Sequence, residues 1–197
     1  MCGRYYFDED FFDKLIDYAQ IVDENVKLKK GEREVFPTQK APILIPKNNK
    51  IYLTEQAWGY PGFKAGQSII NARQETILEK TIFQKGINYH RAIIPMSHYF
   101  EWNKSKDRFS FYDKDSPILF VGGIFDLFDN QHRFTMITSQ AHPSMADIHD
   151  RMPLILNESQ LKDWLFDFSK AKDILKQDMP ILERHATTQQ QDMFDLL

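Results

Sequence analysis

A succession of short runs rich in β-branched and aromatic residues most constrains the fold of this chain. Each run has the length of a strand rather than of a helix, and polar or turn-forming residues separate one run from the next. A chain with this pattern builds a core in which strands predominate. The runs between residues 91 and 138 are Arg91–Pro95, Tyr99–Trp102, Phe109–Tyr112, Ile118–Phe125 and Phe134–Thr138.

The N-terminal part of the chain adds further strands. Ile43–Ile45 and Ile51–Leu53 flank the turn sequence Lys47–Lys50, which predicts a hairpin. Glycine and proline break the aromatic segment Trp58–Phe63, so we expect a loop there. The remaining short strands are predicted over Gly3–Phe7 and over Ser68–Asn71.

Helices are predicted in smaller number. Asp8 is a predicted N-cap for a helix that runs to Gln20 with an apolar stripe, and residues 22–34 are predicted to form a charged, exposed loop. Other helices are expected over Glu75–Phe83, Glu158–Phe166 and Ala171–Leu175. These elements indicate an α+β fold, and we expect a single domain over residues 1–197 because no linker or internal repeat interrupts the chain.

Composition limits the protein class. Hydrophobic residues make up 42% of the chain and aromatic residues 14%, values typical of a folded globule. No apolar run approaches the ~18 residues that span a bilayer, and the first residues do not resemble a signal peptide, so a cytoplasmic location without membrane contact is expected. The net charge of -3 neither indicates nor excludes a nucleic-acid partner, because a local arginine cluster sets the field near a cleft.

The only cysteine is Cys2, so removal of Met1 would expose an N-terminal cysteine whose thiol and α-amine are neighbours. Such an aminothiol condenses with an aldehyde to an imine, and the thiol then closes a thiazolidine ring. The closure is intramolecular and draws on effective molarities of order ~10⁵ M when well aligned. The alternative is that a cysteine at this position has no function.

Several motifs, taken in order along the chain, resemble the SOS response-associated peptidase (SRAP) family, whose members shield abasic sites in single-stranded DNA. The resemblance runs from residue 1 to about residue 167 and implies a mixed, strand-rich barrel-like core flanked by helices. The motifs are Met1-Cys2-Gly3-Arg4-Tyr5, Asn71-Ala72-Arg73-Gln74-Glu75-Thr76, Tyr99-Phe100-Glu101-Trp102 and Ile148-His149-Asp150-Arg151-Met152-Pro153.

The resemblance implies a covalent crosslink between the mature N-terminal Cys2 and the aldehyde of an abasic deoxyribose. It implies a site made of Cys2, Asn71, Glu101 and His149, with neither metal nor cofactor, in a monomer that joins the nucleoid when bound to DNA. Glu101 is assigned to sugar-ring opening and proton transfer, and His149 to protonation of the departing oxygen or to imine formation. Asn71 is assigned to orienting the Cys2 amine or a sugar oxygen.

DNA contacts are expected from arginines and aromatic side chains. Arg4 and Arg73 match arginines that hold the DNA backbone in the family, and phosphate contacts of this kind position a strand without reading its sequence. Trp58, with Tyr60 and Phe63, is predicted to stack on exposed bases. The other arginines assigned to DNA are Arg91 and Arg151.

Structural interpretations of the same residues stay open. Glu101 also suits an outward strand residue paired with Lys104, His149 a turn histidine and Asn71 a helix cap, and each arginine suits an ordinary ion pair. Trp58, Tyr60 and Phe63 also suit a role in covering the core. A zinc pair of Cys2 and His149 is discounted, since the chain has no second cysteine.

The chain also departs from the family pattern. Gln74 replaces a commoner serine, and Glu34 stands where asparagine is frequent, which is expected to weaken phosphate binding nearby. Glu183–Leu197 does not show the usual closing strand, and the basic turn Lys104–Arg108 is a candidate compensation.

Three functions remain distinct at this point: abasic-site crosslinking with possible lyase activity, a thiol peptidase that removes its own Met1 with His149 as base, and a DNA-binding module without catalysis.

Overall fold

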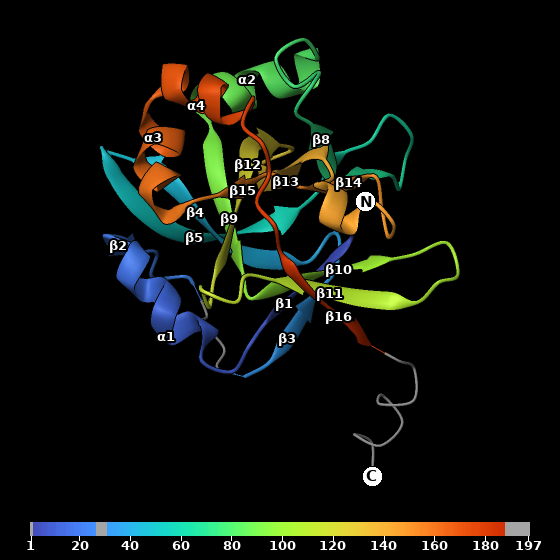
Figure 1. Ribbon diagram of the computed structural model, residues 1–197. Coiled ribbons are helices and arrows are strands. Elements are labelled where there is room, and N and C mark those ends of the chain that lie inside the picture. Colours follow the sequence, from blue (N-terminus) through green and yellow to red (C-terminus); the bar gives the residue numbers. More distant parts are fainter. Residues whose placement is uncertain (1, 27–30, 188–197) are drawn as a thin grey trace.

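The computed structural model describes residues 2–26 and 31–187, and Figure 1 shows how its strands and helices are arranged. Strands predominate, and helices cover parts of the strand-rich centre, as the sequence predicts. The helices are α1 (Phe11–Leu15), α2 (Thr81–Tyr89), α3 (Leu161–Phe166) and α4 (Phe168–Ile174), and 3₁₀ turns span Ile16–Tyr18, Pro143–Met145 and Glu158–Gln160.

A closed barrel forms the centre. Its strands are β4 (Lys40–Lys47), β5 (Lys50–Trp58), β9 (Arg91–Met96), β12 (Leu119–Phe128) and β13 (Gln131–Gln140). They pair in the order β13-β12-β9-β4-β5, and a parallel pairing of β13 with β5 closes the ring. The barrel-like core expected for this chain is therefore confirmed.

Short strands extend the barrel. β2 (Ile21–Val22) pairs with β5, β15 (Ile155–Leu156) with β12, and both β8 (Asn71–Arg73) and β14 (Arg151–Pro153) pair with β13. Because β8 and β14 flank β13, they bring Arg73 and Arg151 to the same end of that strand. A small ribbon of β6 (Tyr60–Pro61) and β7 (Ser68–Ile69) stands apart from this sheet.

A second sheet, here called the N-terminal sheet, has the order β16-β11-β10-β1-β3. Its members are β1 (Arg4–Phe7), β3 (Arg33–Val35), β10 (His98–Trp102), β11 (Arg108–Tyr112) and β16 (Glu183–Thr187). The expectation that the end of the chain lacks a closing strand is wrong for residues 183–187, because β16 pairs antiparallel with β11 along its whole length. The rest of that segment, residues 188–197, lies outside the described residues.

The helix boundaries differ from those predicted. The first α-helix is shorter than predicted, beginning at Phe11 and giving way to a 3₁₀ turn after Leu15. The helix expected from Glu75 begins only at Thr81, since residues 74–79 form turns. Part of the predicted loop over residues 22–34 is strand, because β3 begins at Arg33.

Aromatic side chains fill much of the interior. Tyr5, Phe7, Phe11 and Phe12 pack ring against ring where β1 meets α1, and Tyr99 stacks on Phe111 within the N-terminal sheet. Such pairs add about 0.5–1.5 kcal/mol each beyond the area that they bury. Among the described residues, no helix is long and apolar enough to cross a membrane.

Candidate active site

The pairing of β1 with β10 places Cys2 beside Glu101. Arg4 lies opposite Phe100 in this antiparallel pair, so the residues that precede Arg4 run alongside those that follow Phe100. Both side chains are buried, with exposed fractions of 1% for Cys2 and 2% for Glu101. Cys2 precedes β1 and Glu101 lies on β10, so both are enclosed where these strands meet, and the charge of Glu101 acts on the Cys2 thiol.

Asn71 reaches the same position from the barrel. It begins β8, and its side-chain Nδ2 donates a hydrogen bond to the backbone carbonyl of Cys2 at 3.0 Å. The other side-chain atom, Oδ1, is buried and has no hydrogen-bond partner among the described residues. Asn71 thus fixes the backbone of Cys2 and keeps one buried acceptor available for a ligand.

Burial controls the protonation of this group. Burial, followed by the charge of Glu101, raises the pKa of the Cys2 thiol well above its usual value, and the thiol donates to the carbonyl of Arg4 at 3.7 Å. Burial also raises the pKa of Glu101 to about 7. A carboxyl with this pKa exchanges a proton readily at neutral pH, whereas the thiol stays protonated until a base removes its proton.

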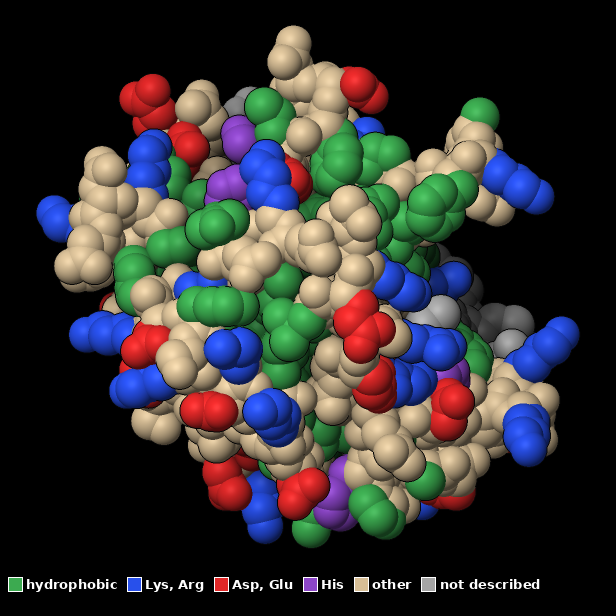
Figure 2. All heavy atoms as spheres, turned by 90° about the horizontal axis from the view of Figure 1, so that it is seen from above, with side chains coloured by type: hydrophobic (Ala, Val, Ile, Leu, Met, Phe, Trp, Pro, Cys, Tyr) green, Lys and Arg blue, Asp and Glu red, His purple; other side chains and the backbone are tan. Residues whose placement is uncertain are grey.

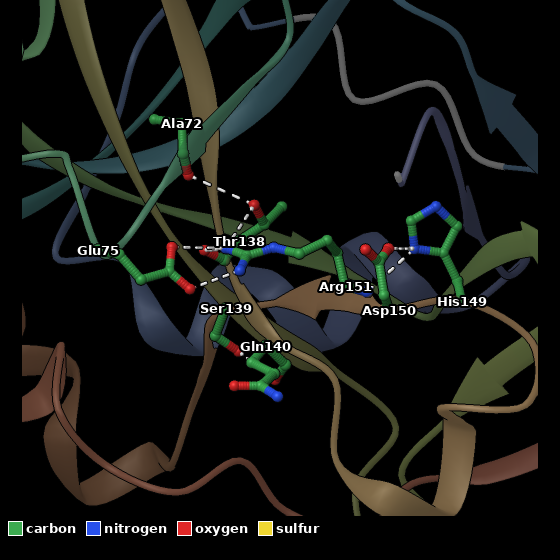
Figure 3. A network of polar contacts seen from close by, with 8 residues as sticks. All are labelled: Ala72, Glu75, Thr138, Ser139, Gln140, His149, Asp150 and Arg151. Atoms are coloured by element: carbon green, nitrogen blue, oxygen red, sulfur yellow. Dashed lines mark hydrogen bonds and ion pairs between the residues drawn. The ribbon is translucent and has the colours of Figure 1, made fainter.

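His149 lies on the wall of a cleft of about 730 Å³ that Trp102 also lines, here called the His149 cleft. Figure 3 shows its ring turned toward Asp150, whose Oδ1 lies 3.0 Å from Nδ1. The backbone nitrogen of Arg151 lies 3.0 Å from the same Nδ1. Burial lowers the pKa of His149, so the imidazole is largely neutral at pH 7 and able to accept a proton.

Arg151 is held by the protein itself (Figure 3). Its guanidinium forms a two-pronged ion pair with Glu75, with Nη2 at 3.0 Å from Oε2, and also donates to the carbonyl of Thr138. The side chain is only 11% exposed. The ion pair of Glu75 was not predicted from the sequence, although Glu75 lies two residues after Arg73 in a motif that carries site residues.

Arg73 and Arg4 lie at the surface. Arg73 is exposed and lines a second cleft, here called the Asn71 cleft, of about 810 Å³, whose wall includes Asn71 and Phe63. Arg4 is 41% exposed. Figure 2 shows two arms that project from one side of the molecule with a hollow between them and Lys or Arg side chains at both tips.

Trp58 does not reach the surface, so the prediction that it stacks on bases is wrong, and the same holds for Tyr60. Both side chains are fully buried. Trp58 lies opposite Phe134 where β5 and β13 close the barrel, and its Nε1 donates to the carbonyl of Ile70. Of the three aromatic residues predicted to stack on bases, Phe63 alone is exposed, at 90%.

Arg91 is likewise not placed to bind DNA. Its side chain is buried, and its guanidinium donates to backbone carbonyls at the ends of two helices. Ile87 and Asn88 belong to the last turn of α2, and Trp164 and Leu165 to the last turn of α3. A cation at this point satisfies carbonyls that the helices leave unpaired and meets the negative ends of their dipoles.

Replacing Arg91 with leucine is expected to lower the free energy of unfolding by about 3 kcal/mol, because the buried carbonyls of both helix ends lose their donors. Urea unfolding measures this change. Binding of single-stranded DNA by the folded variant is expected to match that of the wild type, whereas Arg73→Leu is expected to weaken binding and leave stability nearly unchanged. Loss of DNA binding by folded Arg91→Leu protein would contradict the structural role.

Comparisons with known proteins agree with this architecture. The abasic site processing protein YedK of Escherichia coli (strain K12) is 30% identical over 176 residues, which cover 84% of this chain and 79% of the relative. The abasic site processing protein YoaM of Bacillus subtilis (strain 168) is 31% identical over 194 residues, covering 89% and 84%. The abasic site processing protein HMCES of Xenopus tropicalis is 28% identical over 141 residues, covering 56% and 42%.

Solved structures share the fold. A crystal structure of a protein from Bordetella bronchiseptica superimposes with a TM-score of 0.79 at 21% identity, covering 95% of this chain and all of that chain. The family model described as SOS response associated peptidase (SRAP) matches residues 1–192, which is nearly the whole sequence. The chain therefore belongs to the SOS response associated peptidase family.

Proposed function

We propose that this protein captures abasic sites in single-stranded DNA by forming a thiazolidine crosslink through Cys2 once Met1 has been removed. The single observation that supports it best is the buried group in which Asn71 holds the Cys2 backbone beside Glu101. The names of the relatives, which are abasic site processing proteins, support the substrate class.

The chemistry balances without an oxidant or a reductant. The α-amine of Cys2 adds to the aldehyde carbon of the ring-opened deoxyribose, and loss of water gives an imine. The Cys2 sulfur then adds to the same carbon while the thiol proton passes to the imine nitrogen. Because the α-amine and the thiol belong to one residue, the second step is intramolecular and fast once the thiol loses its proton.

Glu101 is placed for the proton transfers. With a pKa raised to about 7, its acid form can donate to the sugar-ring oxygen during opening, and its carboxylate can accept the thiol proton during closure. The unpartnered Oδ1 of Asn71 suits a hydrogen bond from the Cys2 amine or a sugar hydroxyl. His149 lines the neighbouring cleft, and we assign it to proton transfer at the oxygen that leaves as water when the imine forms.

The strand is held mainly by exposed cations and by one exposed ring. Arg73 and Arg4 supply phosphate contacts beside the buried group, whereas the charge of Arg151 is neutralised by its ion pair with Glu75. Phe63 projects from the wall of the Asn71 cleft and offers a stacking face. These contacts read shape and charge rather than sequence.

The Phe63→Ala variant is expected to bind single-stranded DNA about tenfold more weakly, since one base–aromatic stack contributes ~1–3 kcal/mol. Fluorescence anisotropy with a labelled oligonucleotide measures the loss, and thermal unfolding should be unchanged because the ring is exposed. The Leu78→Ala variant, which removes another exposed apolar side chain, is the matched control. An affinity equal to wild type would remove Phe63 from the DNA contact.

A peptidase that acts on other peptides is less well supported. A cysteine nucleophile of that kind needs a lowered pKa, and burial raises the pKa of Cys2. Removal of the protein's own Met1 is compatible with this site, because the Met1–Cys2 peptide bond belongs to the same chain and does not have to diffuse to the site. We propose it as the preparatory step, assisted by Glu101.

Intact-mass spectrometry tests the proposal. Mature protein is incubated with an abasic single-stranded oligonucleotide, and the expected product has the mass of both components minus one water. The same spectrum of the protein alone shows whether Met1 is absent. No adduct from mature protein would overturn the proposal, and an adduct from protein that retains Met1 would show that the Cys2 amine is not required.

A further inference from the structure

The outer face of the N-terminal sheet carries, besides Arg4, charged and aromatic side chains to which the proposed function gives no role. Residues opposite one another in a sheet point to the same side, so the register places Arg4 with Phe100 and Trp102 with Arg108. Tyr5, Tyr99 and Glu101 alternate with these residues and point inward, where they are buried. The face is therefore distinct from the buried group around Cys2.

Arg108 lies across this face. Its guanidinium carbon is 3.6 Å from the centroid of the Phe100 ring, and its Nη2 is 3.2 Å from Oε1 of Glu34. Arg108 is on β11 and Glu34 on β3, and β10 and β1 lie between these strands. The side chain thus spans the sheet with its plane fixed by the ring beneath it.

Arg4 shares the same carboxylate. Its Nη1 lies 3.5 Å from Oε1 of Glu34, and its guanidinium carbon lies 4.7 Å from the Phe36 ring centroid and 5.1 Å from that of Trp102. Two guanidinium groups therefore share one carboxylate, and these three side chains together are positively charged. Arg4 is 41% exposed and Arg108 is 21% exposed with its Nε buried, so the Nη groups of the two residues are the ones that can reach phosphate oxygens.

This arrangement, here called the arginine platform, consists of Arg4, Arg108, Glu34, Phe100 and Trp102. It is continuous with the candidate active site, since Trp102 also lines the His149 cleft and Arg4 is two residues from Cys2. A strand that leaves the His149 cleft past Trp102 meets the platform next. Its charge is opposite to that of a phosphodiester chain.

We propose that the arginine platform binds the phosphates of nucleotides that flank the abasic site, with Arg108 as a phosphate-binding residue. The inference rests on the proposed function in that single-stranded DNA is the bound strand. Glu34 orients the two arginines but also competes with phosphate for them. This competition lowers the affinity for DNA. Arg108 and Glu34 therefore change affinity in opposite directions.

Anisotropy with undamaged single strands of about 4 and about 16 nucleotides, across a salt series, tests the proposal. Arg108→Gln is expected to weaken binding of the long strand about tenfold and to reduce the magnitude of its salt slope by ~0.7, the value for one phosphate contact. Glu34→Gln is expected to strengthen binding of the long strand about threefold, because a competing charge is gone. The short strand is expected to bind both variants nearly as it binds wild type.

Lys162→Gln on α3 is the control, since it removes an exposed charge away from the N-terminal sheet. Equal effects of Arg108→Gln on both strand lengths, or none on either, would overturn the platform. Weaker binding by Glu34→Gln together with a lowered melting temperature would show a structural role instead. Crosslinking of an abasic oligonucleotide by the wild type tests the proposed function separately. Absence of that crosslink in the wild type would contradict the proposed function and not the platform.

Discussion

Replacing Cys2 with serine is expected to abolish the stable adduct with abasic single-stranded DNA, by ~10³-fold or more in yield at fixed time. The serine variant keeps an α-amine, so an imine with the aldehyde still forms. A hydroxyl is a far weaker nucleophile than a thiol, so the ring does not close and the imine hydrolyses. Denaturing gel electrophoresis of the labelled oligonucleotide measures the loss.

Borohydride sharpens this test, because it reduces an imine to a stable amine. The Cys2→Ser variant is expected to give a crosslink only when borohydride is present, whereas the wild type gives one without it. Both proteins need the same confirmed loss of Met1, which intact mass establishes. A stable adduct of Cys2→Ser without borohydride would contradict thiazolidine formation, and DNA binding without any trapped imine would exclude the α-amine as the attacking group.

The barrel-like core was predictable because a known family pattern covers most of this chain, and the strand runs after residue 91 agree with it. β9, β10, β11, β12 and β13 all lie where those runs occur. The nearness of Asn71 to Cys2 was predictable only through the family motifs, because it depends on the pairing of β8 with β13. No local pattern connects these residues.

The failed predictions for Trp58 and Arg91 share one physical cause, which is that burial is decided by distant segments. Trp58 precedes a glycine, as a loop residue would, yet it is the last residue of β5, and the closure of the barrel by Phe134 covers it. Arg91 is an arginine at the start of an apolar strand, and its role depends on α2 and α3 ending at the same point. The helix expected from Glu75 is a separate case, because residues 74–79 form turns and α2 begins only at Thr81.

Glu101→Gln is the second large effect that we expect. The amide keeps the shape of the carboxyl but neither gives nor takes a proton, so crosslinking is expected to slow by ~10²–10⁴-fold. Affinity for DNA is expected to change little, because the side chain is buried and does not face the exposed arginines. Single-turnover crosslinking at saturating DNA separates the two quantities, and Glu79→Gln, which changes an exposed carboxylate, is the control. Equal losses of rate and affinity would indicate a structural role.

The pH dependence gives this prediction a second, independent readout. The pKa of Glu101 in the folded protein, about 7, lies above its reference value of 4.5, so the folded state binds this proton more tightly than the unfolded state. The stability that this proton contributes is present below the reference pKa and is lost as the pH rises through about 7. We therefore expect the melting temperature of the wild type to fall across this window and that of Glu101→Gln to fall less.

The crosslinking rate of the wild type is expected to decline above the same pH, because ring opening needs the acid form of Glu101. This decline should be absent from the variant. A wild-type protein whose stability rises from pH 5 to pH 8, relative to the variant, would contradict the raised pKa on which the assignment of Glu101 depends.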